Sequence, residues 1–364
     1  SSAASDVYKR QGDGVCIAGE SFWVDTHDVV VRHMRFRRGE TKVHHRDDSF
    51  GGNPIGNIMI DHCSCSWGLD ENISFYRHMY DPGEGYNKEK LPTVNVTIQN
   101  TISSQALDTY NHAFGSTLGG ENCAFVRNLW ASNAGRNPSV GWFGIFNFVN
   151  NVVYNWVHRS VDGGDYRAMF NMVNNYYKPG PATPSGTHYF FNQSLQRDGA
   201  TSLGPSKWHF SGNIMEGDDA VTADNWKGFK NSTSYSIDDI KVDTIIQTSG
   251  DHDHQKYHYD WDTYTYKNYE TAAEAYESVL AAVGAWPRDL IDTRIVKSVR
   301  EGLAPYGNHG IIDLPSQAEG PLAYDTFDRV VDSDGDGMDD AWELANGLSP
   351  ADPADGNSLT ELGY

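Results

Sequence analysis

The stretch Asn147-Phe148-Val149-Asn150-Asn151 returns 24 residues later as Asn171-Met172-Val173-Asn174-Asn175. Each copy is a short apolar run closed by polar residues, which is the pattern of a β-strand leading into a turn. Similar runs lie at 29–33, 58–62, 96–100 and 124–128, and a weaker one lies at 208–213. Successive runs are about 23 to 38 residues apart, which is a spacing typical of solenoid repeats.

The segments between these runs favour a parallel β-helix. An alternating β/α fold would need helices of about 10 to 15 residues between the strands, and no such pattern occurs before about residue 215. In a β-helix the repeated asparagines can bond the neighbouring turn and each other as a ladder. A β-sandwich with Asn-rich turns is the alternative, but the even spacing of the two Asn doublets favours the solenoid.

We therefore predict an all-β, right-handed parallel β-helix with a short helical C-terminal region. Helical spacing of apolar residues predicts helices over 271–283 and 290–299, which should pack back on the β-helix. The predicted divisions are 1–11, 12–324 and 325–364. The first has neither periodicity nor an apolar leader core, so we treat it as uninformative and as a candidate for non-native sequence.

Composition excludes several classes of partner. The formal net charge of -21 argues against nucleic acid and anionic membranes, which require a basic surface. No stretch approaches the ~20 apolar residues of a membrane span. The four cysteines have no CxxC zinc spacing, so we expect unpaired, buried thiols; they are Cys16, Cys63, Cys65 and Cys123.

The segment from Asp332 to Glu343 fits a calcium loop. It has carboxylates at loop positions 1, 3, 5, 9 and 12, with Gly337 at position 6, as an EF-hand loop does. The predicted ligands are Asp332, Asp334, Asp336, the Met338 carbonyl, Asp340 and Glu343. A solvated acidic tail is the alternative, but a twelve-position match favours a structural calcium site. The segment resembles Asp-rich thrombospondin type 3 or dockerin-like repeats, and a paired loop is expected to be missing.

Several motifs of the β-helix region occur in the order found in one enzyme family. They are Gly12-Asp13-Gly14-Val15-Cys16-Ile17, the run from Val29 to Arg37, Ile60-Asp61-His62 within Asn57 to Trp67, Arg136-Asn137-Pro138 eight residues beyond Asn128, and the run from Val173 to Pro181. On these motifs the region from Gly12 to Pro181, and more weakly to Glu301, resembles the pectate lyase family (polysaccharide lyase family 1). The family's N-terminal coils, normally upstream of Gly12, are expected to be missing.

The resemblance implies a lyase that cleaves α-1,4-polygalacturonate by calcium-assisted β-elimination and gives 4,5-unsaturated oligogalacturonides. Calcium bridging the C6 carboxylate would acidify the C5 proton, and Arg136 falls where the family has its arginine base. Free arginine has a pKa above about 12, so neighbouring calcium and cations would have to lower it. We therefore expect an alkaline optimum. A surface arginine, or one that only binds the substrate carboxylate, is the alternative.

The resemblance also implies further site residues, each of which could instead be an ordinary turn residue. The implied metal ligands are Asp48, Asp70, Glu71 and Asp47, whereas Asp61 and His62 are expected to be structural. The implied substrate contact is His112. The second arginine of many family members is replaced by Ser139 and Gly141. Its role would pass to Arg127, Arg159 or Arg167.

The expected partner is polygalacturonate, and the expected protein is a monomer, secreted or on a bacterial cell surface. Its acidity conflicts with a polyanionic substrate, unless calcium and a local arginine cluster reverse the potential in the cleft. A pectin lyase is one alternative, against which Asp48 and Asp70 argue because that chemistry needs no calcium. A polygalacturonase needs paired catalytic carboxylates, and its Asn-Thr-Asp and Gly-His-Gly hallmarks are absent. A non-catalytic β-helix that binds polysaccharide is the third alternative.

Overall fold

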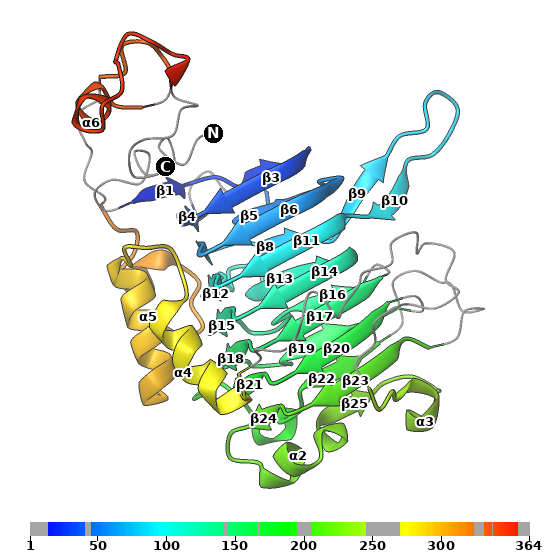
Figure 1. Cartoon of the computed structure of the whole chain (residues 1–364). Coiled ribbons are helices and arrows are strands. Elements are labelled where there is room, and N and C mark those ends of the chain that lie inside the picture. Colours follow the sequence, from blue (N-terminus) through cyan, green and yellow to red (C-terminus); the bar gives the residue numbers. More distant parts are fainter. Residues whose placement is uncertain are drawn as a thin grey trace.

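The chain forms a right-handed parallel β-helix, seen here in a computed structural model (Figure 1). The structure describes residues 14–40, 45–141, 144–165, 168–194, 205–244, 270–323, 331–336 and 338–355. The coils build three parallel sheets, numbered 1 to 3, whose strands are given below. Each coil passes through sheet 3, sheet 2 and sheet 1 in turn, and the strands of each sheet pair in parallel from one coil to the next. The predicted fold is therefore confirmed.

The strands of the three sheets are short and in coil order. Sheet 1 contains β1 (Val15–Ala18), β4 (Met34–Arg37), β7 (Ser64–Ser66), β12 (Ile102–Ser104), β15 (Leu129–Ala131), β18 (Val152–Tyr154), β21 (Tyr176–Lys178) and β24 (Ile214–Met215). Sheet 2 contains β3 (His27–Arg32), β6 (Gly56–Asp61), β11 (Val94–Gln99), β14 (Glu121–Val126), β17 (Ile145–Val149), β20 (Met169–Val173) and β23 (Lys207–Ser211). Sheet 3 contains β2 (Phe22–Val24), β5 (Phe50–Gly52), β8 (Glu71–Phe75), β13 (Phe114–Gly119), β16 (Ser139–Gly141), β19 (Val161–Gly163), β22 (Phe191–Gln193) and β25 (Phe229–Asn231).

The apolar runs visible in the sequence are the strands of sheet 2. Their alternate side chains point inward and stack on the same position of the next coil. One such stack runs through Ile60, Ile98, Phe125 and Phe148, all of them buried. Cys63, Cys65 and Cys123 are buried free thiols, as predicted, whereas Cys16 is only partly buried.

The asparagine ladder forms at the turn from sheet 2 to sheet 1. The side-chain carbonyl of Asn151 accepts from the Asn128 amide at 2.9 Å, and its amide group donates to Asn175 at 3.1 Å and to the Phe125 carbonyl at 2.8 Å. The same pattern continues from Asn175 to Asn213. Each asparagine thus satisfies buried backbone groups that a turn would otherwise leave without a partner.

Replacing Asn151 with alanine should lower the free energy of unfolding by about 3 kcal/mol or more. The change leaves several buried donors and acceptors unpaired, each costing about 1 to 3 kcal/mol. Equilibrium urea unfolding measures the difference. Asn192, whose carbonyl accepts from Ser232 at an exposed position, is the control, and an equal loss in both variants would contradict the ladder's role.

The helices lie mainly along sheet 1 and at the C-terminal coils (Figure 1). They are α2 (Asp219–Ala223), α3 (Ile237–Ile240), α4 (Ala272–Ala282), α5 (Leu290–Glu301) and α6 (Asp340–Ala345), with short 3-10 turns at Ser185–Thr187, Asn225–Gly228 and Pro315–Ala318. The helices α4 and α5 confirm the two predicted segments and share a buried apolar cluster with sheet 1. No helix in the described ranges has the length and apolar character needed to cross a membrane.

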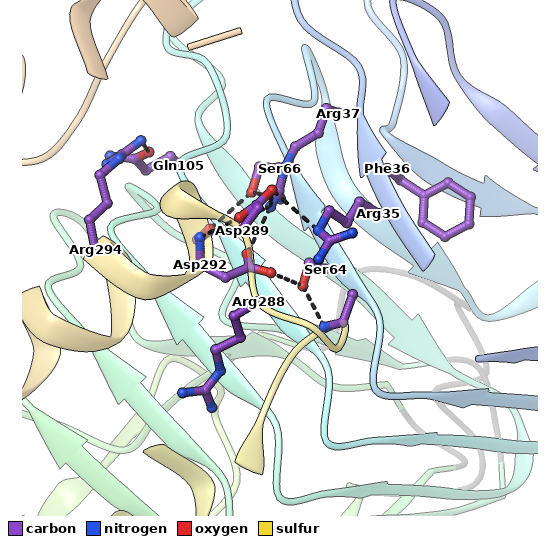
Figure 2. Close-up of polar contacts among 12 residues, drawn as sticks. Arg35, Phe36, Arg37, Ser64, Ser66, Gln105, Arg288, Asp289, Asp292 and Arg294 are labelled. Atoms are coloured by element: carbon purple, nitrogen blue, oxygen red, sulfur yellow. Dashed lines mark hydrogen bonds and ion pairs between the residues drawn. The ribbon is translucent and has the colours of Figure 1, made fainter. Parts of the chain in front are cut away.

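Buried charges fix α5 on sheet 1, as Figure 2 shows. Arg37 donates to Asp292 at 2.7 Å, and Ser64 donates to the other oxygen of Asp292 at 2.6 Å. Asp289 pairs with both Arg35 and Arg37 at 3.3 and 3.1 Å. Because a buried charge without a partner is costly, this network specifies where the helix sits.

One hairpin interrupts the coils. β9 (Arg77–Tyr80) and β10 (Glu89–Pro92) pair antiparallel between β8 and β11, and they project from the solenoid (Figure 1). The two runs that flank this hairpin, at Ile58 and Val96, are 38 residues apart. The hairpin stands beside the cavity described next.

Candidate active site

A cavity of about 560 Å³ lies between sheet 3 and the hairpin. Acidic side chains and cationic side chains both line it. The lining residues are Trp23, Arg46, Asp47, Asp48, Gly52, Asn53, Asp70, Glu71, Ser74, Tyr76, Arg77, Lys90, Thr117 and Arg136. Parallel stacking explains why residues far apart in the sequence line one cavity. Glu71 of β8 is in register with Phe114 of β13, and β13 pairs in turn with β16.

Three carboxylates gather on one side of the cavity. Asp48 is 8% exposed and accepts from the Glu71 amide at 3.0 Å. Burial, and then the charge of Glu71, raise the pKa of Asp48 well above its ordinary value. Like charges held this close favour either a proton or a cation. Hard oxygen ligands of this kind suit calcium.

Asp70 and Glu71 form the centre of this group together with His112. One ligand atom from each of the three residues lies within 4.8 Å of the other two, and His112 Nε2 is paired with Asp70 Oδ1. Burial raises the pKa of Asp70, but the hydrogen bond and charge of His112 outweigh it and lower the pKa overall. Asp70 is therefore ionised at neutral pH and able to hold a cation.

Asp47 lies at the cavity wall with its carboxylate already engaged. Its Oδ1 accepts from Arg38 Nε at 2.6 Å, and its backbone carbonyl accepts from the amides of Leu69 and Asp70 at 2.9 and 3.0 Å. In this arrangement Asp47 positions the turn that carries Asp70. A place for its carboxylate among the metal ligands stays a prediction.

Arg136 points into the same cavity as the acids. It donates to Glu71 Oε1, which also accepts from Thr117 at 2.6 Å, and its guanidinium lies 4.4 Å from the Phe114 ring centroid. Burial by itself lowers the pKa of Arg136, but the charge and hydrogen bond of Glu71 more than offset it, so the pKa lies above its ordinary value. Its φ of 53° is uncommon for a residue other than glycine.

The arginines considered for the second role lie in different places. Arg159 pairs with Asp162 at 2.5 Å, and its guanidinium is 5.4 Å from the Phe114 ring that Arg136 also contacts. Arg127 is at the turn after β14, where it pairs with Glu270 at 3.2 Å and does not line the cavity. Arg167 lies outside the described residues.

Asp61 and His62 have the structural role expected of them. Asp61 accepts from Arg32 at 2.9 Å, from His62 at 2.7 Å and from Asn100 at 3.1 Å. These bonds tie three consecutive coils together at the turn after β6. Neither residue lines the cavity.

Sequence reasoning missed the cationic wall of the cavity. Arg77 and Lys90 come from the hairpin, and Arg46 comes from the turn before β5. Arg77 lies over the Tyr76 ring at 4.8 Å and donates to Asn53 at 3.4 Å. The long spacing between the runs at 58–62 and 96–100 was the signal of an insertion, but it did not show where its side chains would point.

The C-terminal loop brings together a second set of acids. Carboxylate oxygens of Asp332, Asp334 and Asp336 lie within 4.8 Å of one another, and so do those of Asp336, Glu343 and Asp355. Burial and the charges of Asp334 and Asp336 raise the pKa of Glu343 to about 7. Gly337 lies outside the described residues, and Asp355 was not predicted. Buried carboxylate oxygens of Asp334, Asp336 and Glu343 have no hydrogen-bond partner, which fits a cation site.

Comparison with known proteins identifies relatives of this chain. No protein-family model matches the chain. A protein of Aspergillus terreus named "Probable pectate lyase C" is 30% identical over 376 residues, covering 97% of this chain and 74% of that protein. Proteins of the same name from Aspergillus flavus and Aspergillus fumigatus are 28% and 29% identical over 365 residues, with the same coverage.

Similar solved structures are more distant. One is described as "Structural insights into substrate specificity and the anti beta-elimination mechanism of pectate lyase", with a TM-score of 0.41, 14% identity, and coverage of 77% of this chain and 67% of that chain. Another is described as "Pectate lyase bound to hexasaccharide", with a TM-score of 0.39, 12% identity, and coverage of 76% and 66%.

Proposed function

Because the chain belongs to the pectate lyase family, we propose that this polysaccharide lyase cleaves α-1,4-polygalacturonate by calcium-assisted β-elimination, with Arg136 as the base. The observation that carries the proposal is that Arg136 shares one cavity with Asp48, Asp70 and Glu71. A base and a set of metal ligands on neighbouring coils are what removal of a proton beside a carboxylate requires.

The reaction needs a base that removes one proton from the uronate ring. Neutral Arg136 takes the C5 proton, the C5–H electrons form the C4=C5 double bond, and the C4–O4 bond breaks. The O4 oxygen leaves with the adjacent sugar and takes up a proton, so that one chain end becomes unsaturated. Calcium, when bound by Asp48, Asp70 and Glu71, supplies a positive charge that stabilises the developing carboxylate-linked carbanion.

Glu71 links the two halves of this mechanism. Its carboxylate is the partner that raises the pKa of Arg136, and it is also a proposed calcium ligand. Thr117 holds the same oxygen at 2.6 Å, so Glu71 is kept in place independently of Arg136. If the negative charge of Glu71 were engaged by the metal, the pKa of Arg136 would fall, and more of the arginine would be in the neutral form that can take a proton.

The cationic wall suits a polyanionic substrate. Arg46, Arg77 and Lys90 line the same cavity as the acids, where they would bind uronate carboxylates next to the cleaved sugar. Together with bound calcium, these cations would attract the substrate locally in spite of the net charge of -21. His112 and Arg159 are further proposed substrate contacts. Arg167 is proposed on the sequence alone.

A second calcium ion belongs to the 325–364 segment in this proposal. The acids of Asp332, Asp334, Asp336 and Glu343 converge as a calcium loop requires. The described residues of this segment, 331–336 and 338–355, include no basic side chain, so the ion would be structural. We further propose a monomeric, extracellular or cell-surface protein, because a polymeric substrate is met outside the cell.

The test is an ultraviolet assay for the double bond conjugated to the carboxylate. On polygalacturonate, absorbance should rise with calcium and stop when EDTA is added. A rise that EDTA does not affect, strongest on methylated pectin, would identify a pectin lyase. New reducing ends without absorbance would identify a hydrolase, and no products with retained polysaccharide binding would identify a binding module.

A further inference from the structure

The acids of the C-terminal segment form two groups that share Asp336. One group contains Asp332 and Asp334, and the other contains Glu343 and Asp355. Asp355 lies twelve residues beyond the end of the calcium-loop pattern. The structure therefore adds a carboxylate that the pattern does not include.

The Asp355 carboxylate is oriented by its own turn. Its Oδ2 accepts from the Ser349 amide at 2.7 Å, and its backbone amide donates to the Asp352 carbonyl at 3.1 Å. Its Oδ1 is buried and has no hydrogen-bond partner. One oxygen is thus held by the backbone, which leaves the other to face the acid group.

Glu343 provides independent support for a ligand between these acids. Its side chain is fully buried at the start of the chain's last described helix, and neither carboxylate oxygen has a hydrogen-bond partner. Buried carboxylates are normally paired, hydrogen-bonded or bound to a metal. Asp336 and Asp355, which form one group with Glu343, are acceptors too, and a bound cation would satisfy all three.

Asp340, the ninth residue of the loop pattern, is used differently. Both of its oxygens accept from Ser333, one from the backbone amide at 2.8 Å and one from the hydroxyl at 2.6 Å. It belongs to neither acid group. Its carboxylate therefore braces the loop against α6.

We propose that Asp355, and not Asp340, completes the calcium site. The ligands are then the carboxylates of Asp332, Asp334, Asp336, Glu343 and Asp355, together with the Met338 carbonyl. Six oxygen ligands meet the lower limit for calcium. The ion closes residues 332 to 355 into one unit, and a single loop suffices without a paired copy. This inference rests on the proposed calcium site of the C-terminal segment.

Calcium titration calorimetry on the whole chain tests the inference. Glu343→Gln identifies the binding event that belongs to this segment, since it should remove that event. Asp355→Asn should weaken the same event by ~10-fold or more, a loss expected for metal-site groups, whereas Asp340→Asn should weaken it much less, because both oxygens of Asp340 already accept from Ser333. Asparagine keeps the acceptor for Ser349, so the turn is preserved.

Asp352→Asn is the matched control in the same turn. It makes the same charge change at a side chain that accepts from the Ala354 amide and belongs to neither acid group, so affinity should be unchanged. If Asp340→Asn weakens binding and Asp355→Asn does not, the inference is wrong and the calcium site survives. If Glu343→Gln leaves every binding event in place, the segment binds no calcium and both proposals fall. Neither result bears on the lyase cavity.

Discussion

Arg136→Ala should lower kcat on polygalacturonate by about 100- to 10,000-fold, the range for loss of a positioned general base. The guanidinium donates to Glu71 of β8 and lies against Phe114, which places it beside the proposed metal ligands. Initial rates of double-bond formation at saturating calcium measure the effect. KM should change much less than kcat, because the base acts in the transition state.

Two variants separate a base from a residue that only binds substrate. Arg136→Lys keeps a cation, so it should retain substrate affinity while kcat remains low. Arg127→Ala removes an arginine that pairs with Glu270 away from the cavity, and its kcat should match that of the unmodified chain. A large rise in KM with kcat intact in Arg136→Ala would show that Arg136 only grips the carboxylate.

The strands of sheet 2 could be predicted from sequence because they are five or six residues long and their apolar runs recur from coil to coil. Those of sheet 3 could not, since many are three-residue segments such as β5, β16 and β19. Their glycines are set by close approach between coils. A Cβ on Gly52 would lie 1.9 Å from the Val24 carbonyl oxygen, and one on Gly163 would lie 2.3 Å from that of Val140. Contacts with the next coil, rather than local propensity, decide these strands.

Some residues of the candidate site could likewise be predicted from the sequence, and others could not. Asp48, Asp70, Glu71 and Arg136 could be predicted as a set only through the family resemblance, because up to 88 residues separate them and stacking alone brings them together. Arg77 and Lys90 lie on a hairpin that breaks the repeat, so no periodic pattern points to them. Asp355 was missed for a related reason. The calcium-loop pattern is local, whereas the ligand comes from the turn that follows the helix.

Asp70→Asn should raise the calcium concentration needed for half-maximal lyase activity by about 10- to 100-fold or more. Asp70 has a lowered pKa, and one of its carboxylate oxygens lies within 4.8 Å of ligand atoms of Glu71 and His112. Its negative charge is therefore available to a cation at neutral pH. The substitution removes that charge with little change of shape. Added calcium should therefore restore most of the rate, since the base and the cationic wall are intact.

Asp47→Asn is the matched comparison at the same cavity wall. Its carboxylate is held by Arg38 at 2.6 Å, and removal of its charge leaves the buried Arg38 guanidinium without that partner. We therefore expect Asp47→Asn to lower thermal stability more than calcium affinity, and Asp70→Asn to do the reverse. Calcium dependence of the rate and a melting curve for each variant decide the matter. If excess calcium rescues Asp47→Asn but fails to rescue Asp70→Asn, our assignment is wrong. Asp47 is then the calcium ligand in place of Asp70, and its carboxylate must turn away from Arg38 to bind the ion.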